Sequence, residues 1–123
     1  MAGIATNKDL VMEYFNLISS RDLGRLLSLF ADDAVVYEPF SSEDGLHGTG
    51  EIEPFLKVVL MANAGLDREI TFPQNEQEGE ITVQVRFKRG GVVKGNFTFA
   101  TTAVQTEQGA EKRIKVLKIH FSN

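Results

Sequence analysis

The 123-residue sequence contains no cysteine and no tryptophan, and only two histidines and three prolines. The absence of cysteine excludes disulfides, thiolate nucleophiles, iron–sulfur clusters and zinc sites built on cysteine. Two histidines are too few for a His-rich metal centre, and no spacing of His, Asp and Glu matches a metal site. We therefore expect neither a metal nor a cofactor.

Excess positive charge and long apolar runs are also missing. The formal net charge is −4, which gives no support for nucleic-acid binding. No apolar run approaches the ~20 residues that a membrane-spanning helix needs. The first residues have neither the basic start nor the apolar core of a signal peptide. We expect a cytoplasmic protein that contacts neither nucleic acid nor membrane.

The composition that remains is that of a folded chain. Hydrophobic residues make up 42% and charged residues 24% of the sequence, which excludes a disordered or fibrous protein. At ~150 residues per domain the length corresponds to one unit. We therefore predict a single domain over residues 1–123.

The first half of the chain has apolar residues at helical spacing. Thr6 or Asn7 is a plausible N-cap for the first helix, and Asp22 can cap the second. Phe30 belongs to the apolar face of this second helix, which we expect Asp32–Asp33 to end.

A short strand and a third helix follow. Residues 34–40 predict a strand that ends at Pro39, because proline cannot donate to a ladder. The third helix begins at 48–50, with Pro54 in its first turn, and ends at 63–65.

The second half alternates with a period of two, which predicts strands over 81–88, 92–106 and 113–121. A hairpin turn at Gly90–Gly91 joins the first two. With a two-residue turn, Phe97 and Phe99 would form an exposed patch; with a three-residue turn they would join the pocket. The sequence leaves this register open.

Helices followed by antiparallel strands predict an α+β fold. We expect three N-terminal helices packed in a strongly curved mixed or antiparallel sheet that forms a cone-shaped pocket for a small hydrophobic molecule. The residues that we expect to line it are Val36, Phe30, Phe55, Val83, Val85, Phe87, Thr102, Leu117 and Ile119.

The segment from Tyr14 to Phe55 resembles a known family. It contains Leu-Phe-Ala-Asp-Asp-Ala at 29–34, then Val-x-Glu-Pro at 36–39, then Gly48-Thr49. These motifs and the order of elements over essentially the whole chain resemble the nuclear transport factor 2-like superfamily, in its SnoaL-like and ketosteroid isomerase-like branch. The resemblance implies the cone-shaped fold and a homodimer formed through the outer sheet face.

The resemblance also implies two catalytic roles. Tyr14 falls at the position of the oxyanion-hole tyrosine, and Glu38 at that of the aspartate that shuttles a proton on the substrate. If Val36 points into the core, alternation turns Glu38 the same way, where partial desolvation makes a carboxylate a stronger base. The simpler interpretations are a core tyrosine at Tyr14 and a solvent-facing edge residue at Glu38.

One expected donor is absent. Isomerases of this branch use a second acid on a later strand, but residues 92–106 hold no Asp or Glu. The equivalent position is Ala100, Thr101 or Thr102, depending on register. We therefore expect an isomerase-like or cyclase-like pocket protein without a cofactor. The alternative is a non-catalytic ligand-binding or dimeric assembly domain of the same fold.

Two histidines and the basic residues complete the candidates. His47, in the loop before Gly48, is a candidate for the pocket mouth, although a solvated loop histidine fits the sequence as well. His120 alternates with Ile119 and Phe121, so we place it on the outer sheet face. The same face is expected to hold most of the Lys and Arg side chains of the strands.

Overall fold

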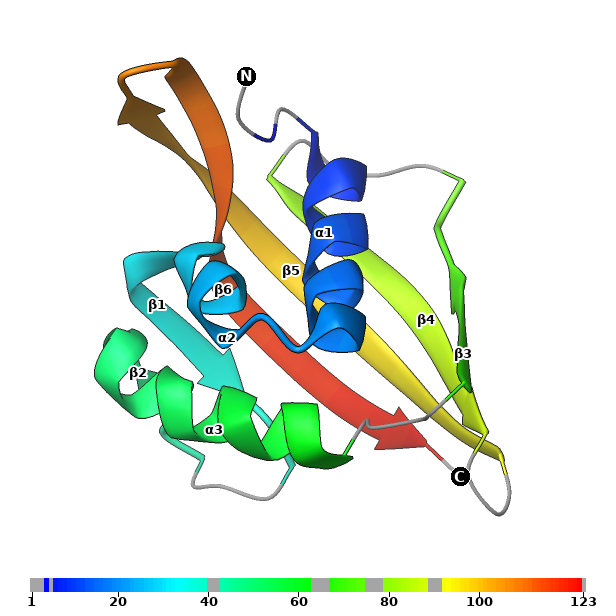
Figure 1. Ribbon diagram of the computed structural model, residues 1–123. Helices are drawn as coiled ribbons and strands as arrows, with labels where there is room; N and C mark the ends of the chain where they lie inside the picture. The colour runs from blue at the N-terminus through cyan, green and yellow to red at the C-terminus, as the bar shows by residue number, and fades with distance from the viewer. Residues whose placement is uncertain are drawn as a thin grey trace.

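A computed structural model describes Ile4 and residues 6–39, 43–62, 67–74, 79–88 and 92–122. Three helices cover one face of a curved, open sheet (Figure 1). The elements are α1 (Asn7–Ser20), α2 (Leu23–Ser28), β1 (Phe30–Tyr37), β2 (Leu46–His47), α3 (Gly48–Ala62), β3 (Asp67–Thr71), β4 (Glu80–Lys88), β5 (Val92–Thr106) and β6 (Gly109–Ser122). The six strands lie in the order β2-β1-β6-β5-β4-β3. Only the β1–β6 pair of these is parallel. The predicted α+β class with a curved mixed sheet is confirmed.

Helix α1 begins where its cap was predicted. The Thr6 hydroxyl accepts a hydrogen bond from the backbone N–H of Asp9 at 3.1 Å. This bond satisfies one of the amide groups that a helix start leaves without an intrahelical partner. Arg21 closes the helix in the left-handed conformation, with φ of 59°. The buried face of α1 packs against the concave side of the sheet.

The end of α2 differs from the prediction. Asp22 caps this helix through the N–H of Arg25, but the helix stops at Ser28 and Phe30 opens β1. Asp32 and Asp33 therefore do not end a helix; they lie exposed within β1. Phe30 and Val35 pair with β6 on either side of the two aspartates, and the register shifts between them. The low strand propensity of aspartate is thus accommodated at a local irregularity in the strand.

Helix α3 starts at Gly48, which has φ of 78°. Pro54 is the seventh residue of the helix rather than part of its first turn, so that prediction is wrong. Proline has no backbone N–H to donate to the carbonyl four residues earlier in the helix. Because Pro54 is exposed, that carbonyl is open to water. The predicted end at 63–65 lies outside the described residues.

The β4–β5 register answers the question that the sequence left open. Lys88 pairs with Val92, so three residues separate the strands. Val83 then faces Phe97, and Ile81 faces Phe99. Both phenylalanines are buried against the helices, so the alternative of an exposed patch is wrong.

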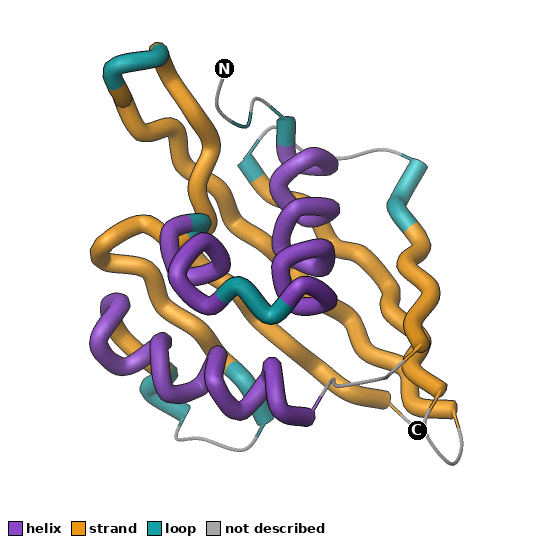
Figure 2. Tube along the Cα trace, in the orientation of Figure 1, coloured by secondary structure: helices purple, strands orange, loops and turns teal. Residues whose placement is uncertain are grey.

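The β5–β6 hairpin is longer than expected. Strand β6 begins at Gly109 instead of Arg113, because pairing continues from Thr106 to the turn at 107–108. Figure 2 shows this end of the hairpin extending past the other strands. A register shift between Ala100 and Thr101 bends the pair there.

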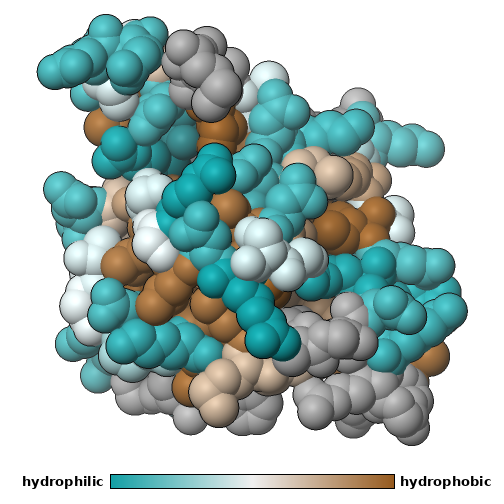
Figure 3. All heavy atoms as spheres, viewed as in Figure 1, coloured by the Kyte–Doolittle hydropathy of each residue, from teal (hydrophilic) through white to brown (hydrophobic). Residues whose placement is uncertain are grey.

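Most large apolar side chains lie between the helices and the sheet. Some reach the surface: Met61 is 78% and Val58 63% exposed. Figure 3 shows brown hydrophobic residues between polar ones on the helix-covered face. Among the described helices, none is both long and apolar enough to span a membrane.

Candidate functional site

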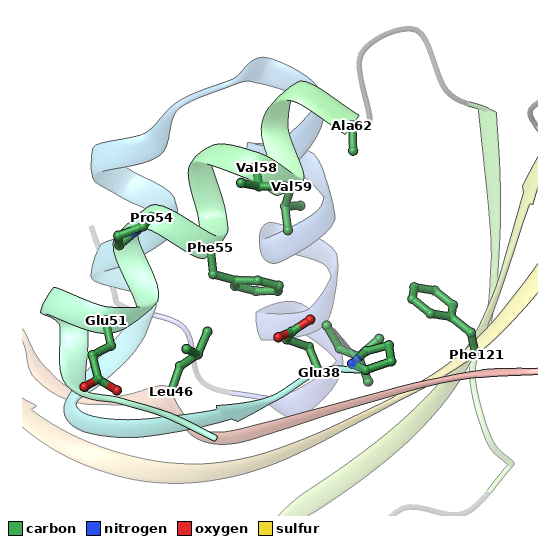
Figure 4. Close-up of a pocket in the computed structure, with 11 residues that line it drawn as sticks. Glu38, Leu46, Glu51, Pro54, Phe55, Val58, Val59, Ala62 and Phe121 are labelled. Atoms are coloured by element: carbon green, nitrogen blue, oxygen red, sulfur yellow. The ribbon is translucent and has the colours of Figure 1, made fainter. Parts of the chain in front are cut away.

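An apolar cavity of about 460 Å³ lies between α3 and the ends of β1 and β6. Its size is at the lower end of the ~300–1,000 Å³ typical of small-molecule sites. Eleven residues line it: Glu38, Pro39, Leu46, Glu51, Pro54, Phe55, Val58, Val59, Ala62, Ile119 and Phe121. Figure 4 shows them, with the Glu38 carboxylate between the aromatic ring of Phe55 and the strand below.

One wall of the cavity is a stripe of α3. Glu51, Phe55, Val58, Val59 and Ala62 all line the cavity, and successive members are one, three or four residues apart. Such positions share one side of a helix. Of this stripe, only Phe55 is among the lining residues predicted from the sequence, although the helical spacing is a signal that identifies the others.

Glu38 enters the cavity because successive side chains of β1 point to opposite faces of the sheet up to the end of the strand. Val36 is fully buried, Tyr37 is 37% exposed on the opposite side, and Glu38 is half-buried. The parallel pairing of β1 with β6 reaches Tyr37, opposite Lys118. Glu38 therefore lies just beyond the strand pair, at the edge between the concave and outer faces.

A second hollow adjoins the cavity on the outer side. It has a volume of about 440 Å³ and shares Glu38, Pro39 and Ile119 with the cavity. Its other lining residues are Tyr37, Glu43, Lys118 and His120. The Lys118 ammonium lies 5.9 Å from the centre of the Tyr37 ring. Glu38 thus borders an apolar hollow on one side and a polar one on the other.

Tyr14 lies elsewhere, in the aromatic core. Its ring meets Phe15, Phe30 and Phe99 edge to face, with centroids 5.0, 6.3 and 5.4 Å apart. It is 1% exposed and does not line the cavity. Burial raises the pKa of the Tyr14 hydroxyl well above that of free tyrosine, and the charge of Arg68 opposes this in part. The structure does not bring Tyr14 and Glu38 together in this cavity.

Arg68 of β3 is the cation that acts on Tyr14. Its guanidinium carbon lies 5.5 Å from the centre of the Phe15 ring, and Nη2 donates to Ser19 Oγ at 2.9 Å. Nη1 is buried with no hydrogen-bond partner among the described residues. Burial lowers the pKa of Arg68, and interaction with Tyr14 raises it.

The predicted lining residues fall into two groups. Phe55 and Ile119 line the cavity. Five others are buried in the core: Val36, Phe30, Val83, Val85 and Leu117. Phe87 is half-buried against that core, and Thr102 pairs with Arg113 in the extended hairpin. These seven do not line this cavity.

Thr101 occupies the inward position among the three candidates for the missing acid. Its hydroxyl donates a 2.8 Å hydrogen bond to Asn7 Oδ1, whereas Ala100 pairs with Val116 and Glu80. Thr101 is not a lining residue of the cavity.

His47 is fixed beside the cavity rather than lining it. Its backbone N–H donates to Glu51 Oε1 at 2.7 Å, and its ring Nε2 lies 2.6 Å from the carbonyl oxygen of Asp44. These contacts tie β2 to the start of α3 and hold Glu51 in place. Within the part of the chain that the structure describes, no cluster of His, Asp and Glu could hold a metal ion.

Neither a protein-family model nor a curated protein matches the sequence. Solved structures do match it in fold. A ketosteroid isomerase-like protein from Erwinia carotovora atroseptica has a TM-score of 0.70 and 12% identity, over 98% of this chain and 96% of that one. An NTF2-like protein of unknown function from Cytophaga hutchinsonii has a TM-score of 0.64 and 13% identity, over 99% and 95% of the two chains. The chain has the nuclear transport factor 2-like fold.

A third structure is that of the epoxide hydrolase/cyclase-like enzyme SalBIII, which takes part in pyran ring formation in the polyether salinomycin. Its TM-score is 0.70 at 15% identity, over 94% of this chain and 89% of that chain. These structures confirm the fold that the sequence resemblance implied. This fold supports many activities, so the site has to carry the functional argument.

Proposed function

We propose that the chain binds a small, mainly apolar carbonyl compound in the cavity under α3, and that Glu38 moves a proton on it. The observation that carries this proposal is the position of Glu38, a half-buried carboxylate on a wall otherwise formed mostly by apolar side chains. A carboxylate held beside a carbon acid acts as a general base and returns the proton at a second carbon. No cofactor is needed for this step.

The names of two neighbours in fold support this class of chemistry. One is ketosteroid isomerase-like and another is epoxide hydrolase/cyclase-like. Tyr14, the predicted oxyanion donor, is not among the lining residues of this cavity. Losing one oxyanion donor commonly costs ~10²–10³-fold in rate. We therefore expect slow turnover.

The second candidate is a binding protein of the same fold without chemistry. It is favoured by a second observation, that the only polar side chains on the described cavity wall are the carboxylates of Glu38 and Glu51. Neither can donate a hydrogen bond to an oxyanion when ionised. On this alternative, ligand affinity would be the measurable property and Glu38 would contribute only its shape and hydrogen bonds.

The two candidates are separated by following the conversion of a β,γ-unsaturated ketone to its conjugated isomer by ultraviolet absorbance. The proposal expects turnover in the unmodified protein that falls at least ten-fold in Glu38→Gln. Glu53→Gln is the matched control, because Glu53 pairs with Lys57 on α3, 3.9 Å away, and does not line the cavity. Ketone binding without turnover would favour the binding protein, and no binding would overturn both.

A homodimer formed through the outer sheet face and a cytoplasmic location are further proposals. The outer face carries polar side chains, among them Thr82 and Thr98, whose hydroxyls bond to each other within the chain at 2.9 Å. Sedimentation equilibrium of the unmodified chain tests the dimer. A monomer at the highest soluble concentration would contradict it.

A further inference from the structure

The ring of Phe121 in β6 packs against Gly95 of the neighbouring strand, a contact that we call the Gly95 seat. Gly95 of β5 pairs directly with Phe121. A Cβ atom at Gly95 would lie 3.1 Å from Cδ1 and 3.2 Å from Cε1 of the Phe121 ring. Its φ is not in the left-handed region, so the backbone does not require glycine here. The close approach of the ring leaves little room for a side chain.

Two other aromatic rings hold Phe121 at this seat. Phe87 and Phe97 both meet it edge to face, each with a centroid separation of 6.4 Å. The same hypothetical Cβ would lie 3.2 Å from the Phe97 ring. Any side chain at Gly95 would therefore be wedged between two rings. Phe121 has the more open surroundings, at 36% exposed against 5% for Phe97, so Phe121 is the ring that would move.

The seat and the cavity lie on opposite sides of Phe121. Strand β6 lies between β5, which carries Gly95, and β1, after which Glu38 enters the cavity. The Phe121 ring therefore stands between Gly95 and the cavity that it lines. A methyl group on residue 95 would push the ring toward α3 and shorten the cavity.

Phe121 also stands at one end of the lining residues. In Figure 4, Glu51, Leu46 and Pro54 lie at one end of the cavity, and Phe121 lies at the other, with Phe55 and Glu38 between. A molecule whose reacting carbon lies at Glu38 would extend its apolar part along α3 toward Phe121. The position of that ring then sets how much apolar length can be buried.

We propose that Phe121, held by the Gly95 seat, is the specificity-determining residue of the cavity and sets the longest apolar chain that it accepts. This inference rests on the proposed function, since it presumes a ligand in this cavity. It names the ligand more closely, as a carbonyl compound with a compact apolar part, because the ring lines the end of the cavity away from Glu51. Gly95 is a positioning residue that acts through Phe121.

The test uses methyl ketones of increasing chain length, from hexanone to hexadecanone, which displace the neutral fluorescent probe N-phenylnaphthylamine. In the unmodified protein, affinity rises about four-fold per methylene while each new methylene is buried. It then stops rising at the chain length that reaches Phe121. Phe121→Ala moves this limit to longer ketones, and Gly95→Ala moves it to shorter ones. In the double variant the Gly95 substitution has no further effect.

Phe72→Ala is the matched control, because Phe72 is half-buried under Lys8 and does not line the cavity. Its limit should equal that of the unmodified protein. Phe121→Leu replaces Phe121→Ala if the latter does not fold, and should give a smaller shift in the same direction. Ketones that bind with one unchanged limit in all variants would overturn this inference and leave the proposed function standing. No displacement by any ketone in the unmodified protein would overturn both.

Discussion

The hydroxyl of Thr101 donates a 2.8 Å hydrogen bond to the side-chain oxygen of Asn7. This bond joins the first residue of α1 to β5 at the point where the β5–β6 register shifts. Asn7 is 3% exposed and is the only polar residue buried to that degree among those described. Because a buried amide oxygen that loses a donor is not rehydrated, the bond contributes more than an exposed one.

Thr101→Val should therefore lower the free energy of unfolding by about 1–3 kcal/mol. The expected result in urea is a lower midpoint with an unchanged m-value. Thr98→Val is the control, since the Thr98 hydroxyl bonds to Thr82 on the exposed face and should cost less. Equal losses for the two variants would contradict the role given to Asn7.

Tyr14 should make the protein sensitive to alkali. Burial raises the pKa of its hydroxyl, so the folded protein holds this proton more tightly than the unfolded chain, where tyrosine has a pKa of ~10. The stabilisation is complete below about pH 10 and is lost as the pH rises above it. Urea unfolding across this range should show the decline in the unmodified protein and a smaller one in Tyr14→Phe. Parallel declines would mean that the Tyr14 hydroxyl is not buried in the folded state.

Arg68 should tolerate loss of its charge. Its buried Nη1 has no partner among the described residues, while its guanidinium lies over the Phe15 ring. Arg68→Met keeps an unbranched side chain there and removes the buried Nη1, which has no partner among the described residues. We expect a urea midpoint equal to or above that of the unmodified protein, whereas Arg68→Ala should lower it through lost packing. A large loss in Arg68→Met would show that the charge itself stabilises the fold.

The cap of α1 gives a simpler prediction. Thr6→Ala removes the acceptor of the Asp9 N–H and should cost about 1 kcal/mol of unfolding free energy, whereas Thr6→Ser should cost little. Thermal unfolding of the three proteins measures this. Equal melting temperatures for the alanine and serine variants would contradict the capping role.

The elements of the fold could be predicted because local signals marked them. Thr6 and Asp22 cap α1 and α2, and alternation identified β4 and β5. The failures occurred where tertiary pairing decided the outcome. Phe30 and Val35 both pair with β6, so Asp32 and Asp33 between them lie within β1, and no local pattern indicates that.

The candidate site was predictable only in part, because the direction of a side chain depends on packing between distant elements. Alternation after Val36 predicted the orientation of Glu38. The period of the first helix could not distinguish a Tyr14 that faces a ligand from one packed on Phe99, a residue far away in the sequence. The role of Phe121 depends on its seat on Gly95 of another strand, which only the β5–β6 register reveals.

The most direct test of the account is where a ligand binds. Methyl-labelled protein titrated with a short methyl ketone should show nuclear magnetic resonance shifts at Val59, Leu46 and Ile119, which line the cavity. Val83 and Val85, buried in the core under α1, should shift little. Shifts concentrated at Val83 and Val85, with Val59 and Ile119 unchanged, would place the ligand beside Tyr14 and contradict the central claim that the cavity at Glu38 is the binding site.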